Sequence, residues 1–191
     1  ISGTTSICEF VGSTTLTASG GTAGTGATFE WLSGSCGGSA ISNNASITVN
    51  PSTTTTYFVR RRGTCNTTAC ISQTVIVNTN SGSPVSMSAT QSFICPGGSS
   101  VLTVNGGLLG TGANYVWYAG ACGSGASIGT GTSITVSPTS TTLYYVRVEG
   151  PCNTTTCASG TIFVRTPSTT PTAITGPTST CGGFTTLTVS G

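Results

Sequence analysis

The residues of this chain whose types and spacing could do chemistry are paired cysteines. Cys65 and Cys70 bound the stretch CNTTAC, and Cys152 and Cys157 bound its near copy CNTTTC. Such a pair could bind zinc, exchange electrons or form a disulfide. Zinc sites favour C-x2-C with a second pair or a histidine close by, and redox sites favour C-x-x-C. The wider spacing here therefore favours structural disulfides.

Missing residue types exclude most other chemistry. Charged residues make up 4% of the 191, and they comprise five Arg and three Glu, with no Lys, Asp or His. Serine–histidine–aspartate triads, histidine metal centres and aspartate-rich calcium loops each need an absent side chain. Five Arg cannot line a nucleic-acid groove. We expect no enzymatic activity, no cofactor or metal and no nucleic-acid partner.

A repeat organises the chain. Cys8 recurs at Cys95 and Cys181, and Trp31 recurs at Trp117, with offsets of 86 or 87 residues. The repeat predicts domains at 1–83 and 84–170. Residues 171–191 match the first strands of a third repeat, either truncated or completing a neighbour's sandwich. No apolar run approaches the roughly 20 residues that span a bilayer, so we expect no membrane insertion.

Apolar residues alternate with a period of two, which predicts strands rather than helices. Six or seven short strands per repeat indicate an all-β fold built from β-sandwiches. The strands expected in the first repeat are a short leading strand near residue 1, then 13–18, 28–32, 45–49, 55–62 and 71–77; those in the second are 99–104, 114–118, 132–136, 142–149 and 160–165.

The same alternation assigns each apolar side chain to a face. The residues expected in the core are Leu16, Ala18, Phe29, Trp31, Ile47, Val49, Tyr57, Val59, Val75 and Val77, with Leu102, Val104, Tyr115, Trp117, Ile134, Val136, Tyr144, Val146, Ile162 and Val164 as their counterparts. The opposite face carries an unexpected apolar stripe, which is a candidate interface between chains or neighbouring repeats. The alternative is that a loop or the chain's own crossover strand covers it. The stripe consists of Leu32, Phe58 and Ile76 in the first repeat and Tyr118, Tyr145 and Phe163 in the second.

Four elements carry a resemblance to a known family: Cys8 before TTLTA, FEW ending at Trp31, the run SITVNPSTTTTYFV, and GTCNTTAC. Together they resemble the immunoglobulin-like repeats of giant secreted adhesins and surface filament proteins of Bacteroidota, the gliding and type 9 secretion bacteria. The resemblance implies tandem immunoglobulin-like β-sandwiches of about 86 residues that act as extracellular spacer or adhesive modules. Four cysteines per repeat and the absence of Asp depart from that pattern.

The immunoglobulin-like strand order suggests a disulfide pairing. Four cysteines allow three pairings. In that order Cys8 and Cys36 lie at one end of the sandwich, and Cys65 and Cys70 lie at the other. The predicted disulfides are Cys8–Cys36, Cys65–Cys70, Cys95–Cys122 and Cys152–Cys157, with Cys181 unpaired in this segment. Disulfides indicate an oxidising compartment, so we expect a secreted or cell-surface protein.

These features predict a structural or adhesive segment of an extracellular filament or repeat-containing surface adhesin. Its partners would be copies of itself or neighbouring repeats. One alternative is a carbohydrate-binding module that holds surface glycans on the aromatic stripe. Another is a fimbrial subunit that polymerises by strand donation. Sequons at Asn44, Asn66 and Asn153 are possible glycosylation sites.

Overall fold

A computed structural model describes residues 1–179 and 181–191, and it confirms the all-β class. Residue 180, within the predicted third segment, lies outside the described residues. The described residues form no helix of the length and apolar character that a membrane crossing needs. The strands of the first repeat are β1 (Ser6–Cys8), β2 (Thr14–Thr17), β3 (Thr28–Ser33), β4 (Ala40–Ser42), β5 (Ser46–Val49), β6 (Thr55–Arg62) and β7 (Ile71–Asn78).

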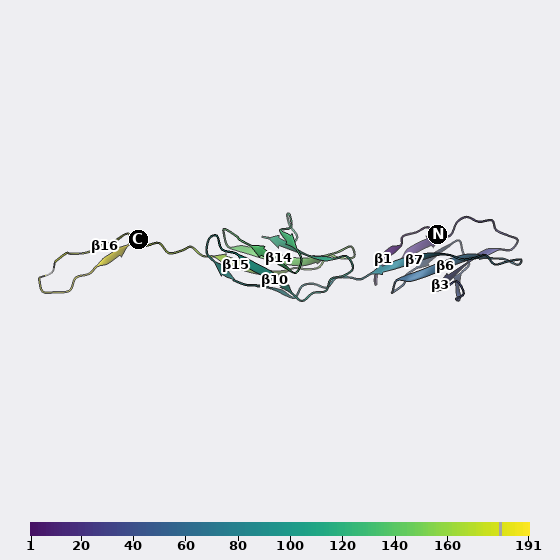
Figure 1. Ribbon diagram of the computed structural model, residues 1–191, viewed down its shortest axis with the longest axis horizontal. Helices are drawn as coiled ribbons and strands as arrows, with labels where there is room; N and C mark the ends of the chain where they lie inside the picture. The colour runs from purple at the N-terminus through teal and green to yellow at the C-terminus, as the bar shows by residue number, and fades with distance from the viewer. Residues whose placement is uncertain (180) are drawn as a thin grey trace.

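The second repeat follows the same plan and ends before a separate hairpin. Its strands are β8 (Ser86–Ala89), β9 (Phe93–Ile94), β10 (Ser100–Asn105), β11 (Asn114–Ala119), β12 (Gly129–Thr130), β13 (Ser133–Val136), β14 (Thr142–Glu149) and β15 (Ala158–Val164), and the hairpin pairs β16 (Ala173–Thr175) with β17 (Thr188–Ser190). The two repeats and the hairpin lie end to end in an extended rod (Figure 1).

Each repeat is a sandwich of a five-stranded sheet and a smaller sheet. The larger sheets have the orders β1-β7-β6-β3-β4 and β12-β11-β14-β15-β9, and the smaller ones are β2-β5 and β13-β10-β8. In both repeats a short early strand runs parallel to the last strand, since β1 pairs with β7 and β9 with β15. These parallel pairs bring the beginning of each repeat beside its end.

The predicted strands are confirmed to within two residues, apart from the leading strand. The first strand of the sheet is β1, whereas the segment near residue 1 makes only an isolated bridge between Ser2 and Thr17. Within the two repeats, strands β4, β8, β9 and β12 were not predicted. They have two to four residues each, too few for a clear alternation pattern.

The predicted core is confirmed. Every expected residue belongs to one of two buried clusters or packs against it. Trp31 and Trp117 are fully buried at equivalent positions. Their indole N–H groups donate to the carbonyls of Asn44 and Gly131, at 2.9 Å each, so neither buried polar group lacks a partner.

The outer apolar stripe is not the continuous exposed surface that the alternation predicted. Leu32 and Tyr118 are buried, Phe58 and Tyr145 are half-buried, and only Ile76 and Phe163 are exposed. Alternation identifies the face of the strand on which a side chain lies, but it does not reveal which other segments of the chain cover that face.

The loops that follow β3 and β11 provide this cover. Gly34 and Gly120 occupy equivalent positions just after these strands, with φ of 79° and 84°. Such a left-handed conformation suits glycine, and it reverses the chain direction there. The loop backbone then lies over the sheet, where the Arg60 guanidinium donates to the Cys36 carbonyl at 3.2 Å. In the second repeat the equivalent loop lies against the Arg147 guanidinium at Gly123.

Candidate functional site

None of the four predicted disulfides forms. The cysteines pair instead as Cys36–Cys70, Cys122–Cys157 and Cys8–Cys152. The first two bonds are equivalent and lie within one repeat each, whereas the third connects the two repeats. All nine cysteines belong to the described part of the chain, and Cys65, Cys95 and Cys181 are free and exposed there.

The predicted pairing within each repeat was wrong because it assumed that a loop stays at the end of the strand that it follows. Cys36 follows β3, but its loop folds back along the sheet toward Cys70, which directly precedes β7. The Cα atoms of Cys36 and Cys70 lie 6.0 Å apart, and those of Cys122 and Cys157 lie 6.1 Å apart. Both distances suit a disulfide. Each bond fastens the covering loop to the sheet beneath it.

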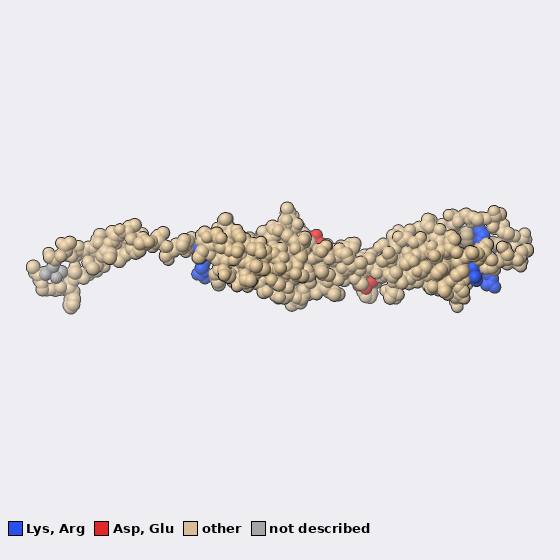
Figure 2. Space-filling model, in the orientation of Figure 1, with Lys and Arg blue, Asp and Glu red and all other residues tan. Residues whose placement is uncertain are grey.

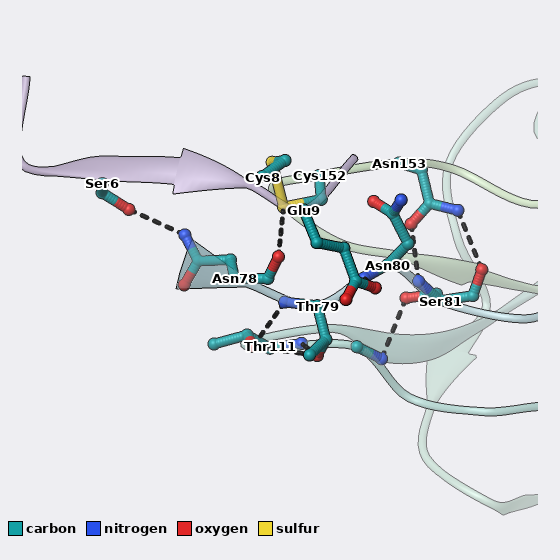
Figure 3. Close-up of a disulfide and its surroundings, with 11 residues drawn as sticks. Ser6, Cys8, Glu9, Asn78, Thr79, Asn80, Ser81, Thr111, Cys152 and Asn153 are labelled. Carbon is teal, nitrogen blue, oxygen red and sulfur yellow. Dashed lines mark hydrogen bonds between the residues drawn. A yellow bond between two sulfur atoms is a disulfide. The ribbon is translucent and has the colours of Figure 1, made fainter. Parts of the chain in front are cut away.

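The third disulfide contradicts the assumption that the cysteines of each repeat pair within that repeat. Cys8 ends β1 and pairs in register with Asn78 at the end of β7, where the linker leaves the first repeat. Cys152 lies in the loop between β14 and β15, at the end of the second repeat that receives the linker (Figure 3). Their Cα atoms are 5.6 Å apart, although the two residues are separated by 144 positions.

Hydrogen bonds hold the linker between the repeats (Figure 3). The side chain of Asn153 accepts from the Ser81 amide at 2.8 Å and donates to the Ser81 carbonyl at 2.9 Å. Thr79 and Thr111 each donate a backbone N–H to the hydroxyl of the other, at 3.0 and 3.1 Å. The Gly110 amide donates to the Ser81 hydroxyl at 3.1 Å. We call these residues, with Cys8 and Cys152, the joint.

Glycine allows the close approach that these bonds need. A Cβ at Gly110 would lie 2.4 Å from the Thr79 carbonyl oxygen, which is closer than real side chains come. Glu9 fixes the linker from the side of the first repeat, because its carboxylate accepts from the Asn80 amide at 2.7 Å. The linker is thus bound by both repeats, and the joint has few free rotations left.

The few charges are distributed unevenly (Figure 2): in this view acidic atoms appear near the middle of the rod, and basic atoms appear at the outer end of the first repeat and beyond the second. In the first repeat the buried Glu30 pairs with Arg60 at 2.5 Å and with Arg62 at 2.8 Å. Hydrogen bonds from Arg62 and Arg60 hold the pKa of Glu30 below its ordinary value of 4.5. This carboxylate therefore stays ionised although it is buried.

The second repeat uses a different arrangement on the same face. The Tyr118 hydroxyl donates to the Glu149 carboxylate at 2.5 Å, and Arg147 pairs with the same oxygen at 2.7 Å. The hydrogen bond to Glu149 raises the pKa of Tyr118, and the bond from Tyr118 lowers the pKa of Glu149. These groups satisfy one another beneath the covering loop. Tyr118 is therefore not available as the glycan platform that the stripe suggested.

The three sequon asparagines differ in accessibility. Asn44 and Asn66 are exposed, whereas Asn153 is half-buried and its amide nitrogen is bound to Ser81. Asn153 is thus a structural residue in this fold, and its predicted role as a glycosylation site conflicts with the joint. No group of three potential metal ligands was found among the described residues.

Sequence reasoning missed the joint, although a signal for it was present. The stretch GTGA occurs at 24–27 and again at 110–113, and the CNTT stretch occurs twice with it. Loop sequences seldom stay the same unless their backbone or side chains do something specific. Identical loops at one end of each repeat could have indicated a surface that contacts the preceding linker.

Comparison with known proteins agrees with the fold. The family model described as "Ig-like domain CHU_C associated" matches residues 1–78 and 83–167. A crystal structure of murine CEACAM1b is 14% identical, with a TM-score of 0.53, covering 85% of this chain and 96% of that one. A four-domain structure of Dscam1 isoform 1.9 is 10% identical, with a TM-score of 0.40, covering 85% of this chain and 43% of that one. No curated protein matches the sequence. The similarity to murine CEACAM1b shows the fold alone.

Proposed function

The chain belongs to the family of CHU_C-associated Ig-like domains, and from this premise we propose that it is a load-bearing structural segment of an extracellular filament or repeat-containing surface adhesin, without catalytic activity. The resemblance to repeats of secreted Bacteroidota adhesins supports this proposal. The three disulfides support it as well, because such bonds persist in oxidising compartments outside the cytosol.

The observation that carries the proposal is the disulfide between the repeats. When the two ends of the chain are pulled apart, tension follows the shortest covalent path. That path runs from residue 1 to Cys8, crosses to Cys152 and continues to residue 191. The residues between 8 and 152, which include nearly all of both cores, bear no tension through their backbone. Such an arrangement suits a protein that must resist extension.

Force spectroscopy on single molecules tests this role. At roughly 3.4 Å per residue, the 144 positions spanned by the disulfide correspond to roughly 500 Å of hidden contour length. We expect the oxidised chain to release none of it. The Cys8→Ser, Cys152→Ser double variant should release about half of it, roughly 250 Å, because Cys36–Cys70 and Cys122–Cys157 still keep 34 and 35 positions out of the path. Equal released lengths for the two proteins would contradict the proposal.

A matched control uses the other disulfide of the first repeat. Cys36 and Cys70 both lie inside the segment that Cys8–Cys152 shields. The Cys36→Ser, Cys70→Ser variant should therefore release no additional length while Cys8–Cys152 is intact. An increase in this variant would show that the tension takes another path.

The alternative of a glycan-binding module has less support, because Tyr118 is buried and its hydroxyl is bound to Glu149. Polymerisation by strand donation would place the hairpin β16–β17 in a neighbouring molecule. In the described part of the chain these two strands pair only with each other.

A further inference from the structure

The second repeat carries an exposed pair of aromatic rings on the outer face of its larger sheet. Phe163 on β15 pairs in register with Phe93 on β9. The two ring centroids lie 5.2 Å apart, with the planes inclined by 23°. The Arg165 guanidinium lies 4.3 Å from the centre of the Phe93 ring. Although these side chains contact one another, Phe93 remains 52% exposed and Phe163 43% exposed. We call the three residues the aromatic stack.

The first repeat has the same strand pairing at this place but none of these side chains. Ser6 on β1 pairs in register with Ile76 on β7, in the place of the two rings. Asn78 stands in the place of Arg165, and its side chain donates to the Ser6 hydroxyl at 2.7 Å. All three positions of the aromatic stack therefore differ between two repeats that share their fold. The fold itself does not require the stack.

A repeat that follows along the chain does not cover this face. In the first repeat, where the joint holds the second repeat in place, Ser6 is exposed and Ile76 is 48% exposed. The joint contacts the strand end instead, because its disulfide starts from Cys8, two residues beyond Ser6 at the end of β1. A repeat docked on the second one in the same manner would therefore leave Phe93 and Phe163 exposed.

Arg165 brings to the aromatic stack a positive charge that no carboxylate of the chain balances. All three glutamates have other partners: Glu30 pairs with Arg60 and Arg62, Glu149 pairs with Arg147, and Glu9 accepts from the Asn80 amide. Arg165 is exposed and forms no salt bridge with any described residue. A guanidinium can contact an aromatic ring and still donate two parallel hydrogen bonds to a carboxylate. The stack is thus complementary to a carboxylate.

The size of the aromatic stack favours a small ring-shaped ligand over a protein. An aromatic side chain buries about 150–250 Å² when it is fully covered, so two half-exposed rings offer roughly 200 Å². A standard protein interface buries about 800 Å² on each partner. One or two sugar units match the smaller area, and their C–H groups pack on the negative face of an aromatic ring. A sugar unit that also carries a carboxylate is a uronic acid.

We propose that the aromatic stack binds a uronic acid unit of an acidic polysaccharide. The sugar packs its C–H groups on the exposed parts of Phe93 and Phe163, and its carboxylate accepts two hydrogen bonds from the Arg165 guanidinium. The second repeat thereby has a binding function that the first repeat lacks. This inference goes beyond the proposed structural role and does not depend on the disulfide between the repeats. The buried Tyr118 takes no part in the site.

Titration calorimetry of the oxidised full chain tests the proposal, with short oligomers of galacturonate and of alginate as ligands. We expect one site per chain, and about tenfold weaker binding of the methyl-esterified galacturonate oligomer, which has the same sugar rings without the charge. Phe163→Ala and Arg165→Gln should each weaken binding about tenfold. Ile76→Ala and Arg61→Gln are the matched controls in the first repeat, and both should bind as the original chain does.

Several results would overturn the inference: no binding of either oligomer, equal binding of the methyl ester, or unchanged affinity in Phe163→Ala or Arg165→Gln. Equal binding of a glutamate oligomer would assign the site to acidic peptides instead. A concentration-dependent dimer that Phe163→Ala abolishes would assign it to a second copy of the chain.

The variants should keep the thermal unfolding midpoint of the original chain, because the substituted side chains lie outside the two buried clusters. Arg165→Gln leaves both rings in place. Its affinity therefore decides the matter by itself if Phe163→Ala lowers the midpoint.

Discussion

Asn153 binds the backbone of Ser81 through both ends of its side-chain amide, at 2.8 and 2.9 Å, and so holds the linker against the second repeat. Asn66 is the same residue at the equivalent place in the first repeat, in a loop with the same internal hydrogen bonds, but it is exposed. The chain therefore contains both a working contact and its own control.

Replacing Asn153 with alanine should loosen the joint. Each hydrogen bond contributes about 0.5–1.5 kcal/mol net, so the two together contribute about 1–3 kcal/mol to linker docking. Amide hydrogen exchange should show that the Ser81 amide loses protection in Asn153→Ala. Asn66→Ala should leave exchange at Ser81 unchanged. Equal protection in both variants would show that the other contacts of the joint suffice.

Gly110→Ala should displace the linker for a steric reason. Its Cβ would lie 2.4 Å from the Thr79 carbonyl oxygen and 2.8 Å from the carbonyl carbon of Asn80, and both are backbone atoms that cannot rotate away. We expect a loss of about 1–3 kcal/mol in the free energy of unfolding, measured by denaturant titration. Gly24→Ala is the matched control, since nothing lies within 4 Å of its Cβ. A stable Gly110→Ala protein with an unmoved linker would contradict the packing described.

Alkylation before reduction should label three cysteines, namely Cys65, Cys95 and Cys181, which are free and exposed. Peptide mapping without reduction should then show Cys8–Cys152, Cys36–Cys70 and Cys122–Cys157. Removing Cys36–Cys70 or Cys122–Cys157 by paired serine substitutions should cost about 2–5 kcal/mol of unfolding free energy in each case. A Cys65–Cys70 peptide would instead restore the pairing expected from strand order.

The stability of the first repeat should fall in acid because of Glu30. Arg62 and Arg60 lower the folded-state pKa of this carboxyl below its ordinary value of 4.5. A depressed pKa stabilises the folded protein above the unfolded-state value, and this contribution is lost as the pH falls through the folded-state value. We therefore expect the decline to begin below 4.5.

Glu30→Gln tests this linkage. The variant should be less stable at neutral pH, because Arg60 and Arg62 lose their partner, and its stability should depend less on pH below about 4.5. Urea titrations between about pH 7 and about pH 3 measure both effects. Parallel pH profiles for the variant and the original chain would exclude Glu30 as the titrating group.

The sequence by itself determined the repeat, the strands and the core. Alternation with a period of two places Leu16, Trp31 and Val59 on one face of their strands, and burial of that face is the dominant favourable contribution to folding. These interactions are local or recur in each repeat, so a single repeat contains the information for them. The same reasoning failed for Leu32 and Tyr118, because a side chain on the outer face is buried or exposed according to the path of a distant loop.

Only the tertiary structure decided which cysteines meet. Strand order places Cys8 and Cys152 at ends of different repeats, and nothing local relates two positions that are 144 residues apart. Disulfide formation requires that two Cα atoms come within about 7 Å, which depends on how a repeat follows its linker and where a loop turns back. Two residues set that geometry. Gly110 has no side chain and so allows the close approach of the Thr79 carbonyl, and Asn153 binds the Ser81 backbone. The alternation pattern reveals neither of these contacts, because each forms between two elements and the pattern describes only a single strand.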